Sequence, residues 1–138
     1  MSGNWVYDIF KMHSHYGVHK YMDNPESKEK IWEHLQFRLD FLKEELAETE
    51  KAINEKDAEE VIDGLIDLCV VAIGTLDIID TDSLKAWDEV LRANMEKKVG
   101  INKSRQNKLG LPDLVKPDGW KKPSHKKNHG ILSKEKKV

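Results

Sequence analysis

Six acidic residues in two neighbouring groups have types and spacing that suit chemistry. Each group contains acids that are three or four residues apart, so they share one face if the segment is an α-helix. They are Glu44, Glu45 and Glu48 in the first group, and Glu60, Asp63 and Asp67 in the second. If the two faces meet, the carboxylates repel one another and lose hydration, which destabilises the fold unless a cation lies between them.

This set of donors favours a hard divalent cation. Mg²⁺ and Mn²⁺ prefer oxygen ligands, whereas di-iron bundles add Glu-x-x-His pairs, and no glutamate here has a histidine three residues later. A Mg²⁺ site beside lysines indicates phosphate chemistry, because cations stabilise the negative charge of phosphate groups. The alternative is that the acidic faces are solvated or form a docking surface for a basic partner.

Helices must position these acids. From Ile31 to about Asn54 apolar residues recur every three or four positions, which predicts a long amphipathic helix. Residues 55–58 form a tight connection, with Asp57 as the predicted N-cap of a second helix over about 58–80. That helix is apolar almost all round, which predicts burial, and Gly64 and Gly74 would let neighbours approach closely. Buried acids need a partner, so the second acidic group is the stronger sign of a metal site.

Two further helices are predicted on either side of this pair. The first covers residues 4–16 and ends near Gly17, and a new element begins near Ser27 after a run of turn residues. The last covers about 83–98, where Asn94 extends an inward apolar stripe and Lys97 and Lys98 flank it. A polar amide there needs hydrogen-bond partners, which either a ligand or the helix end supplies.

Three histidines, His13, His15 and His19, lie close together in the sequence. Their spacing mixes helix faces, and Gly17 interrupts the one pair with helical spacing, His15 and His19. We therefore expect exposed or loosely packed histidines there and not a metal site.

The 138 residues suffice for one domain, and their charge is unevenly divided. Residues 1–80 hold 8 Lys/Arg and 18 Asp/Glu, whereas residues 81–138 hold 15 and 7. An acidic half suits metal and a basic half suits phosphate, although a basic tail that pairs with the acidic half or aids solubility explains the same balance. We expect residues 1–120 to form the domain and the Lys-rich residues 121–138 to form a mobile or wrapped tail.

Other functional classes lack their signals. No apolar run reaches the roughly 20 residues of a membrane span, and no signal-peptide pattern begins the chain, so we expect a cytoplasmic protein without membrane partners. The single cysteine, Cys69, can form neither an intrachain disulfide nor a cysteine-based metal site. No Gly-rich phosphate loop and no aromatic platform for nucleic acid is present.

The acidic groups also carry a resemblance. Glu44-Glu45-x-x-Glu48 followed by Glu60-x-x-Asp63 resembles the two-part motif of the MazG-like all-α nucleoside triphosphate pyrophosphohydrolases, relatives of dimeric dUTPases and phosphoribosyl-ATP pyrophosphohydrolase. The resemblance extends to Asn94-x-x-Lys97 and to Lys116-Pro-x-Gly-Trp120, which is similar to the closing segment of small members, including phage-encoded ones. It covers roughly residues 30–120. Only eleven residues separate Glu48 from Glu60, a short spacer that implies a minimal hairpin.

The resemblance implies an all-α, four-helix, MazG-like bundle with an irregular C-terminal segment, assembled as a homodimer or homotetramer. It implies hydrolysis of (deoxy)nucleoside triphosphates between the α and β phosphates, which gives a nucleoside monophosphate and pyrophosphate. Two alternatives stay open. One is a dUTPase-like or phosphoribosyl-ATP pyrophosphohydrolase-like specificity, and the other is a non-enzymatic helical-bundle interaction protein.

The resemblance also assigns roles to residues. The implied ligands of Mg²⁺, for which Mn²⁺ can substitute, are Glu44, Glu45, Glu48, Glu60 and Asp63. One of the first three would also orient the attacking water, and Asp67, outside the core motif, would have a supporting role at most. Asn94, Lys97 and Lys98 would hold phosphate. The first helix and the stripe of Phe37 and Phe41 are candidates for packing or base contact.

Overall fold

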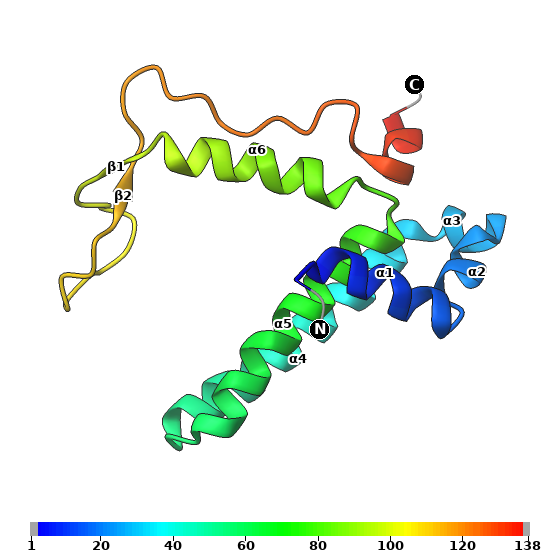
Figure 1. Ribbon diagram of the computed structural model, residues 1–138, viewed down its shortest axis with the longest axis horizontal. Helices are drawn as coiled ribbons and strands as arrows, with labels where there is room; N and C mark the ends of the chain where they lie inside the picture. Colours follow the sequence, from blue (N-terminus) through cyan, green and yellow to red (C-terminus); the bar gives the residue numbers. More distant parts are fainter. Residues whose placement is uncertain (1–2, 137–138) are drawn as a thin grey trace. The chain divides into compact units, whose positions relative to one another are not determined.

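The computed structural model describes residues 3–136, which are mostly helical (Figure 1). The chain divides into two compact units, one of Met1–Ser83 with Lys127–Val138 and one of Leu84–Lys126. The expected all-α fold class is confirmed. Six α-helices lie within the described residues, two more than predicted. The division of the chain at residue 120 stays a prediction.

Capping residues set the boundaries of the N-terminal helices. Helix α1 (Trp5–His15) begins after Asn4, whose side chain accepts a hydrogen bond from the Tyr7 amide at 3.0 Å. Gly17 has a φ of +80°, a conformation that glycine adopts without strain, and it separates α1 from α2 (Val18–Asp23). The expected end of the first helix near Gly17 is therefore confirmed.

The segment expected to be a turn holds a helix boundary. Asn24 is the N-cap of α3 (Pro25–Glu29), because its side chain accepts a hydrogen bond from the Glu26 amide at 2.9 Å. Pro25 occupies the first helical position, where its missing N–H has no cost. The residues that favour turns thus serve to begin a short helix, and both α2 and α3 were missed by the sequence pattern.

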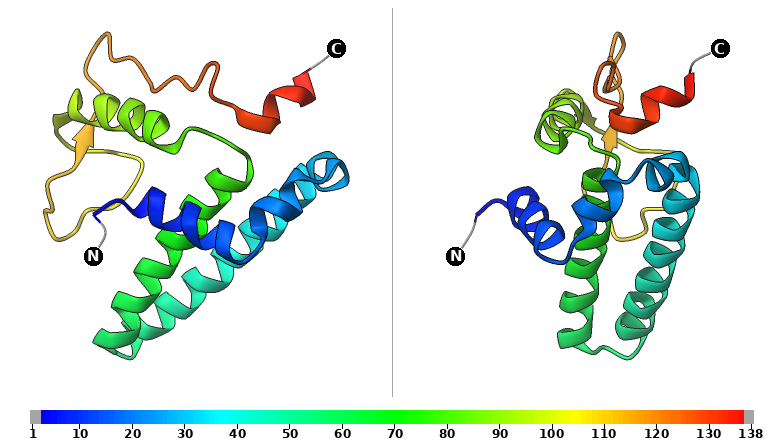
Figure 2. Two further views of the ribbon diagram at one scale, coloured as in Figure 1. Left: turned by 45° about the vertical axis from the view of Figure 1, so that its right-hand side comes forward. Right: turned by 90° about the vertical axis from the view of Figure 1, so that its right-hand side faces the viewer.

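Helices α4 (Ile31–Asn54) and α5 (Ala58–Ile78) form an antiparallel hairpin (Figures 1 and 2). Asp57 caps α5 as predicted, with its carboxylate 3.2 Å from the Glu60 amide nitrogen. Helix α1 packs against the opposite end of α5 from this turn. The hairpin is the scaffold that positions both acidic groups.

The buried face of α4 is not its apolar stripe. Thr49 and Ala52 are buried, with 2% and 4% of their surface exposed, whereas Leu39, Leu46 and Ile53 are about half exposed. The inner face therefore includes small and polar residues at helical spacing, namely Arg38, Glu45, Thr49 and Ala52, together with the half-buried Leu42.

Helix α5 is not buried all round, which corrects the expectation from its composition. Ile62, Leu65 and Ile66 are 65%, 52% and 44% exposed in the single chain. The reason is that α4, α1 and α2 together cover only part of its circumference. Its inner face consists of residues at alternating spacings of three and four, namely Gly64, Asp67, Val71, Gly74 and Ile78.

The core of the first unit lies where α2, α4 and α5 meet. It consists of Met22, Ile31, Ile78 and Ile79, with Ile131 of the C-terminal 3-10 helix η1 (Gly130–Lys136) packed against it. The Ile131 amide donates to the Ile79 carbonyl at 2.8 Å. Apolar burial thus fixes the C-terminal segment at this end of the hairpin.

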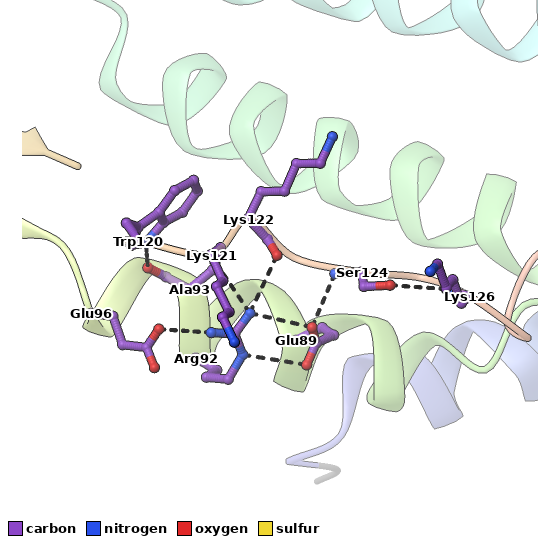
Figure 3. A network of polar contacts seen from close by, with 9 residues as sticks. All are labelled: Glu89, Arg92, Ala93, Glu96, Trp120, Lys121, Lys122, Ser124 and Lys126. Atoms are coloured by element: carbon purple, nitrogen blue, oxygen red, sulfur yellow. Dashed lines mark hydrogen bonds and ion pairs between the residues drawn. The ribbon is translucent and has the colours of Figure 1, made fainter. Parts of the chain in front are cut away.

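The second unit is built around α6 (Ser83–Met95) and a small antiparallel sheet of β1 (Lys98–Val99) and β2 (Leu114–Val115). Residues 120–126 run along α6, held by the network in Figure 3. Arg92 donates to the Lys121 and Lys122 carbonyls, both at 3.4 Å, and the Glu89 carboxylate accepts from the Ser124 amide at 3.0 Å.

Among residues 3–136, no helix has both the length and the apolar character of a membrane span.

Candidate functional site

Glu45 lies at the centre of an acidic cluster on the α4–α5 hairpin. It is half-buried on the inner face of α4, whereas Glu44 and Glu48 are exposed beside it. Burial first, and then the negative charges of neighbouring carboxylates, raise the pKa of Glu45. The neighbours that contribute are Glu48, Asp67, Glu44 and Asp63. Acids of both groups, one on α4 and the other on α5, therefore act electrostatically on Glu45.

A close approach of the two helices places the cluster. A β-carbon on Gly64 would overlap the Thr49 hydroxyl oxygen and lie 3.2 Å from the Thr49 β-carbon. The Thr49 hydroxyl donates to the Glu45 carbonyl at 2.8 Å, so its position is tied to the turn of α4 that carries Glu45. The expectation that Gly64 permits close packing is confirmed, and this contact sets the two acidic groups opposite each other.

A second contact holds the hairpin on the other side of the acids. The Arg38 guanidinium donates from Nε to the Thr75 hydroxyl at 3.1 Å and from Nη2 to the Val71 carbonyl at 3.0 Å. Burial lowers the pKa of Arg38. Arg38 thus links α4 to α5 through two hydrogen bonds. Along α4, the three glutamates of the first acidic group lie between Arg38 and Thr49, so a contact with α5 holds the helix on each side of them.

The donors present fit a hard divalent cation. All the groups that raise the Glu45 pKa are carboxylates, and a cation among them would offset the repulsion that raises it. Oxygen-only donors suit Mg²⁺ or Mn²⁺ better than softer metals. Four of the five predicted metal ligands, Glu44, Glu45, Glu48 and Asp63, belong to this cluster.

Two acids lie differently from the sequence expectation. Asp67 was assigned a supporting role at most. It is half-buried on the inner face of α5, and its negative charge contributes to the raised pKa of Glu45. Glu60 is exposed in the first turn of α5, one turn before Asp63, and is not among the charges that raise the Glu45 pKa. Its role as a metal ligand stays a prediction.

The predicted phosphate-binding residues belong to the second unit. Asn94 is exposed near the end of α6, and Lys98 is exposed in β1. Lys97 is half-buried, with its ammonium 5.3 Å from the centre of the Trp120 ring. The Trp120 indole N–H in turn donates to the Ala93 carbonyl at 2.7 Å, so Trp120 anchors its segment on α6, as expected (Figure 3).

The apolar stripe expected to point inward on α6 is exposed instead. Leu84, Trp87 and Leu91 are each about half exposed or more, whereas Ala93 is buried. Asn94 is therefore not the end of a buried stripe. Because the 120–126 segment covers a different face of α6, the periodicity of the large apolar residues did not identify the buried one.

The sequence pattern missed a second polar group. His13 and His19 both contact the Asp77 carboxylate, with His13 Nδ1 2.6 Å and His19 Nε2 2.7 Å from the same oxygen, Oδ2. His13 is buried, so the expectation of exposed or loosely packed histidines is wrong for this residue. Asp77 is 64 residues from His13 and lies outside any local motif, so only the tertiary fold reveals the group.

The part of the chain that carries the acidic cluster matches a known protein family. A family model described as phosphoribosyl-ATP pyrophosphohydrolase matches residues 16–94, more than half of the chain. The matched range includes all six acids of the hairpin and Asn94. This family is part of the MazG-like all-α nucleoside triphosphate pyrophosphatase superfamily. Neither the comparison with curated proteins nor that with solved structures gives a match.

Proposed function

Because the chain belongs to the phosphoribosyl-ATP pyrophosphohydrolase family, we propose that it is a Mg²⁺-dependent pyrophosphohydrolase that cleaves a nucleoside triphosphate to the monophosphate and pyrophosphate. Members of this superfamily are hydrolases acting on acid anhydrides. The single observation that carries the proposal beyond the family match is that the packed α4–α5 hairpin carries both acidic groups, with Glu45 and Asp67 half-buried on its inner faces.

The ligands of Mg²⁺ in this proposal are the acids of the hairpin, Glu44, Glu45, Glu48, Glu60 and Asp63. When bound, Mg²⁺ or a substituting Mn²⁺ offsets the charge of the phosphate oxygens and lowers the barrier to attack at phosphorus. Asp67 adds negative charge from the inner face of α5, which strengthens the attraction of the site for a cation. All six carboxylates thus have a function in the same site.

Glu45 is the proposed general base among the three glutamates of the first group. Of the three it is the one that is half-buried on the inner face of α4, whereas Glu44 and Glu48 are exposed. It accepts a proton from water as the water oxygen bonds to the α-phosphorus. The bond from that phosphorus to the bridging oxygen breaks, and pyrophosphate leaves with the electron pair.

Asn94, Lys97 and Lys98 are the proposed phosphate-binding residues. An amide N–H donates to a phosphate oxygen, and an ammonium group offsets the charge that develops on the leaving pyrophosphate. Lys97 is the favoured contributor, since its contact with the Trp120 ring restricts its side chain.

A homodimer or homotetramer is the proposed assembly. Ile62, Leu65 and Ile66 of α5 and the leucine stripe of α4 leave large apolar side chains exposed in the single chain. Contiguous exposed apolar surface of this kind marks interaction sites in water-exposed proteins. A second copy that covers α5 would restore the all-round burial that its sequence predicts.

Two substrate classes are compatible with the site. One is the common (deoxy)nucleoside triphosphates, including dUTP, and the other is phosphoribosyl-ATP, which the family description favours. Both require cleavage between the α and β phosphates, so the same residues serve either. The difference concerns the base and its substituents, for which Phe37 and Phe41 are candidate contacts.

A substrate panel tests this proposal. The protein is incubated with Mg²⁺ and each ribonucleoside or deoxyribonucleoside triphosphate, or with phosphoribosyl-ATP, and the products are separated by anion-exchange chromatography. We expect a nucleoside monophosphate and pyrophosphate in equal amounts from at least one substrate, and none when EDTA replaces Mg²⁺. Release of orthophosphate and a diphosphate, or no turnover of any member, would contradict the proposed reaction.

A further inference from the structure

Side chains from three helices converge on one oxygen atom away from the acidic cluster. His13 comes from α1, His19 from α2 and Asp77 from the C-terminal part of α5. Both imidazoles contact Asp77 Oδ2, and the three potential ligand atoms, His13 Nδ1, His19 Nε2 and Asp77 Oδ2, all lie within 4.8 Å of one another. Among residues 3–136, this is the one place where three such atoms converge so closely.

The surroundings hold these side chains in place. The side chains of His13 and Asp77 are only 7% and 16% exposed, and that of His19 is 27% exposed. The Phe10 ring packs against His19, with ring centres 4.5 Å apart. A β-carbon on Gly74 would lie 3.0 Å from His13 Cε1, so the missing side chain lets the imidazole reach α5. The convergence is therefore built into the packing of α1 and α2 on α5.

The one nearby cation faces the other edge of the His13 ring. The same β-carbon on Gly74 would lie 2.5 Å from Arg38 Nη2 and 3.1 Å from His13 Nε2, the nitrogen that does not face Asp77. The Arg38 guanidinium donates to Thr75 and Val71 of α5. The Nδ1 edge of His13, with Asp77 and His19, thus presents two nitrogen ligand atoms and one oxygen ligand atom.

Two imidazole nitrogens with one carboxylate oxygen form a recognised class of metal ligand set. Zn²⁺ and related divalent transition metals accept this mixture, whereas Mg²⁺ and Ca²⁺ prefer oxygen ligands alone. The contacts of 2.6 and 2.7 Å are shorter than the usual N–H···O distance of about 2.9 Å, so the three ligands crowd toward one point. Bonds of about 2.0 Å to a tetrahedral ion would separate ligand atoms by about 3.3 Å, which needs movements below about 1 Å.

We propose that His13 Nδ1, His19 Nε2 and Asp77 Oδ2 bind one divalent transition-metal ion of the zinc type, with water completing the coordination. The ion replaces the two protons that the imidazoles share with Asp77 and fastens α1 and α2 to α5. This site shares no residue with the acidic cluster of the hairpin. Its partial exposure at His19 gives the ion an entry path from solvent.

Binding of Zn²⁺ by the full-length protein tests the proposal. Protein stripped with EDTA and dialysed is titrated with Zn²⁺ by calorimetry in excess Mg²⁺, so that the hairpin acids are occupied by the hard cation. We expect one Zn²⁺ per chain. Titration with Co²⁺ should give visible absorption bands typical of nitrogen ligation, a signal that does not depend on enzymatic activity.

Variants locate the bound ion. His19→Gln and Asp77→Asn should weaken Zn²⁺ binding by about 100-fold or more, since even outer-shell substitutions cost about 10- to 100-fold in affinity. His15→Gln, at an exposed histidine of α1, the helix that carries His13, should bind as the wild type does. His19 is the most exposed of the three ligands, so its variant should keep the fold, which circular dichroism verifies.

Two results would overturn the proposal. One is that the wild type binds no Zn²⁺ in the presence of Mg²⁺, which would leave His13, His19 and Asp77 as a purely hydrogen-bonded group. The other is that His19→Gln and Asp77→Asn bind Zn²⁺ with wild-type affinity, which would place the ion elsewhere. The proposed pyrophosphohydrolase activity stands or falls separately, because it depends on the hairpin acids and not on these residues.

Discussion

The Thr49 hydroxyl of α4 packs directly against the Gly64 backbone of α5 and donates a hydrogen bond to the Glu45 carbonyl at 2.8 Å. One side chain therefore connects the spacing of the two helices to the turn of α4 that carries the central acid. A larger residue at either position would separate the helices where the acidic groups meet. The geometry of the candidate site and the packing of the hairpin depend on the same contact.

Substitution of Gly64 should destabilise the hairpin. Gly64→Ala places a methyl group on the Thr49 hydroxyl, and overpacking of this kind costs about 1–3 kcal/mol of unfolding free energy. Urea denaturation followed by circular dichroism measures the loss, and Thr49→Ala in the same chain should recover part of it. Gly3→Ala is the control, since a β-carbon there meets nothing within 4 Å. Equal midpoints for Gly64→Ala and the wild type would show that the helices are not in close contact.

The repulsion around Glu45 should appear as a pH-dependent stability difference. Its raised pKa means that the folded state binds the proton more tightly than the unfolded state, so the charged form destabilises the fold above that pKa. In EDTA at pH 7.5, Glu45→Gln should therefore melt at a higher temperature than the wild type, by about 1–3 °C. The difference should vanish as the pH falls below the ordinary glutamate value of about 4.3.

Glu50→Gln is the matched control for this comparison. Glu50 is exposed on the same helix and is not among the charges that raise the Glu45 pKa. Its variant should melt as the wild type does at both pH values. A Glu45→Gln protein that is less stable than the wild type at pH 7.5 would mean that the carboxylate makes a favourable contact, contrary to the acidic-cluster interpretation.

Trp120 should control how firmly residues 120–126 lie along α6. Trp120→Phe removes the indole N–H that donates to the buried Ala93 carbonyl, at a cost of about 1–2 kcal/mol. Trypsin should then cleave faster after Lys121, as measured by mass spectrometry of timed digests. Trp87→Phe, at an exposed tryptophan of α6 itself, should leave the cleavage rate unchanged. The same rate in both variants would exclude the proposed anchor.

Local sequence signals predicted the helices that are long or clearly capped. The limits of α4 and the start of α5 at Asp57 agree with the structure, because capping and spacing act within a few residues. Helices α2 and α3 were missed since they have only six and five residues, too few for a periodic pattern. Met22 of α2 packs into the core beside Ile31, the first residue of α4, so tertiary packing and not periodicity holds this segment.

The packed faces were harder to predict than the helices. Large apolar residues usually mark a buried face, but here Thr49 and Gly64 form the close contact, while Leu46 and Ile62 are exposed. The acidic motif was found because its spacing is local on each helix, and Asp67 was undervalued because it lies outside that motif. The contacts of His13 with Asp77 join residues far apart in the sequence, which no spacing rule detects.

The measurement that tests the account most directly is the Mg²⁺-dependent release of pyrophosphate by Glu45→Gln, beside the wild type and Glu50→Gln. The substitution keeps the size of the side chain but removes the proposed base, so kcat should fall by about 10²- to 10⁴-fold. Glu50→Gln should retain wild-type kcat, and both variants should keep the helical circular dichroism spectrum. Wild-type kcat in Glu45→Gln would contradict the assignment of the catalytic site to the acidic cluster of the α4–α5 hairpin.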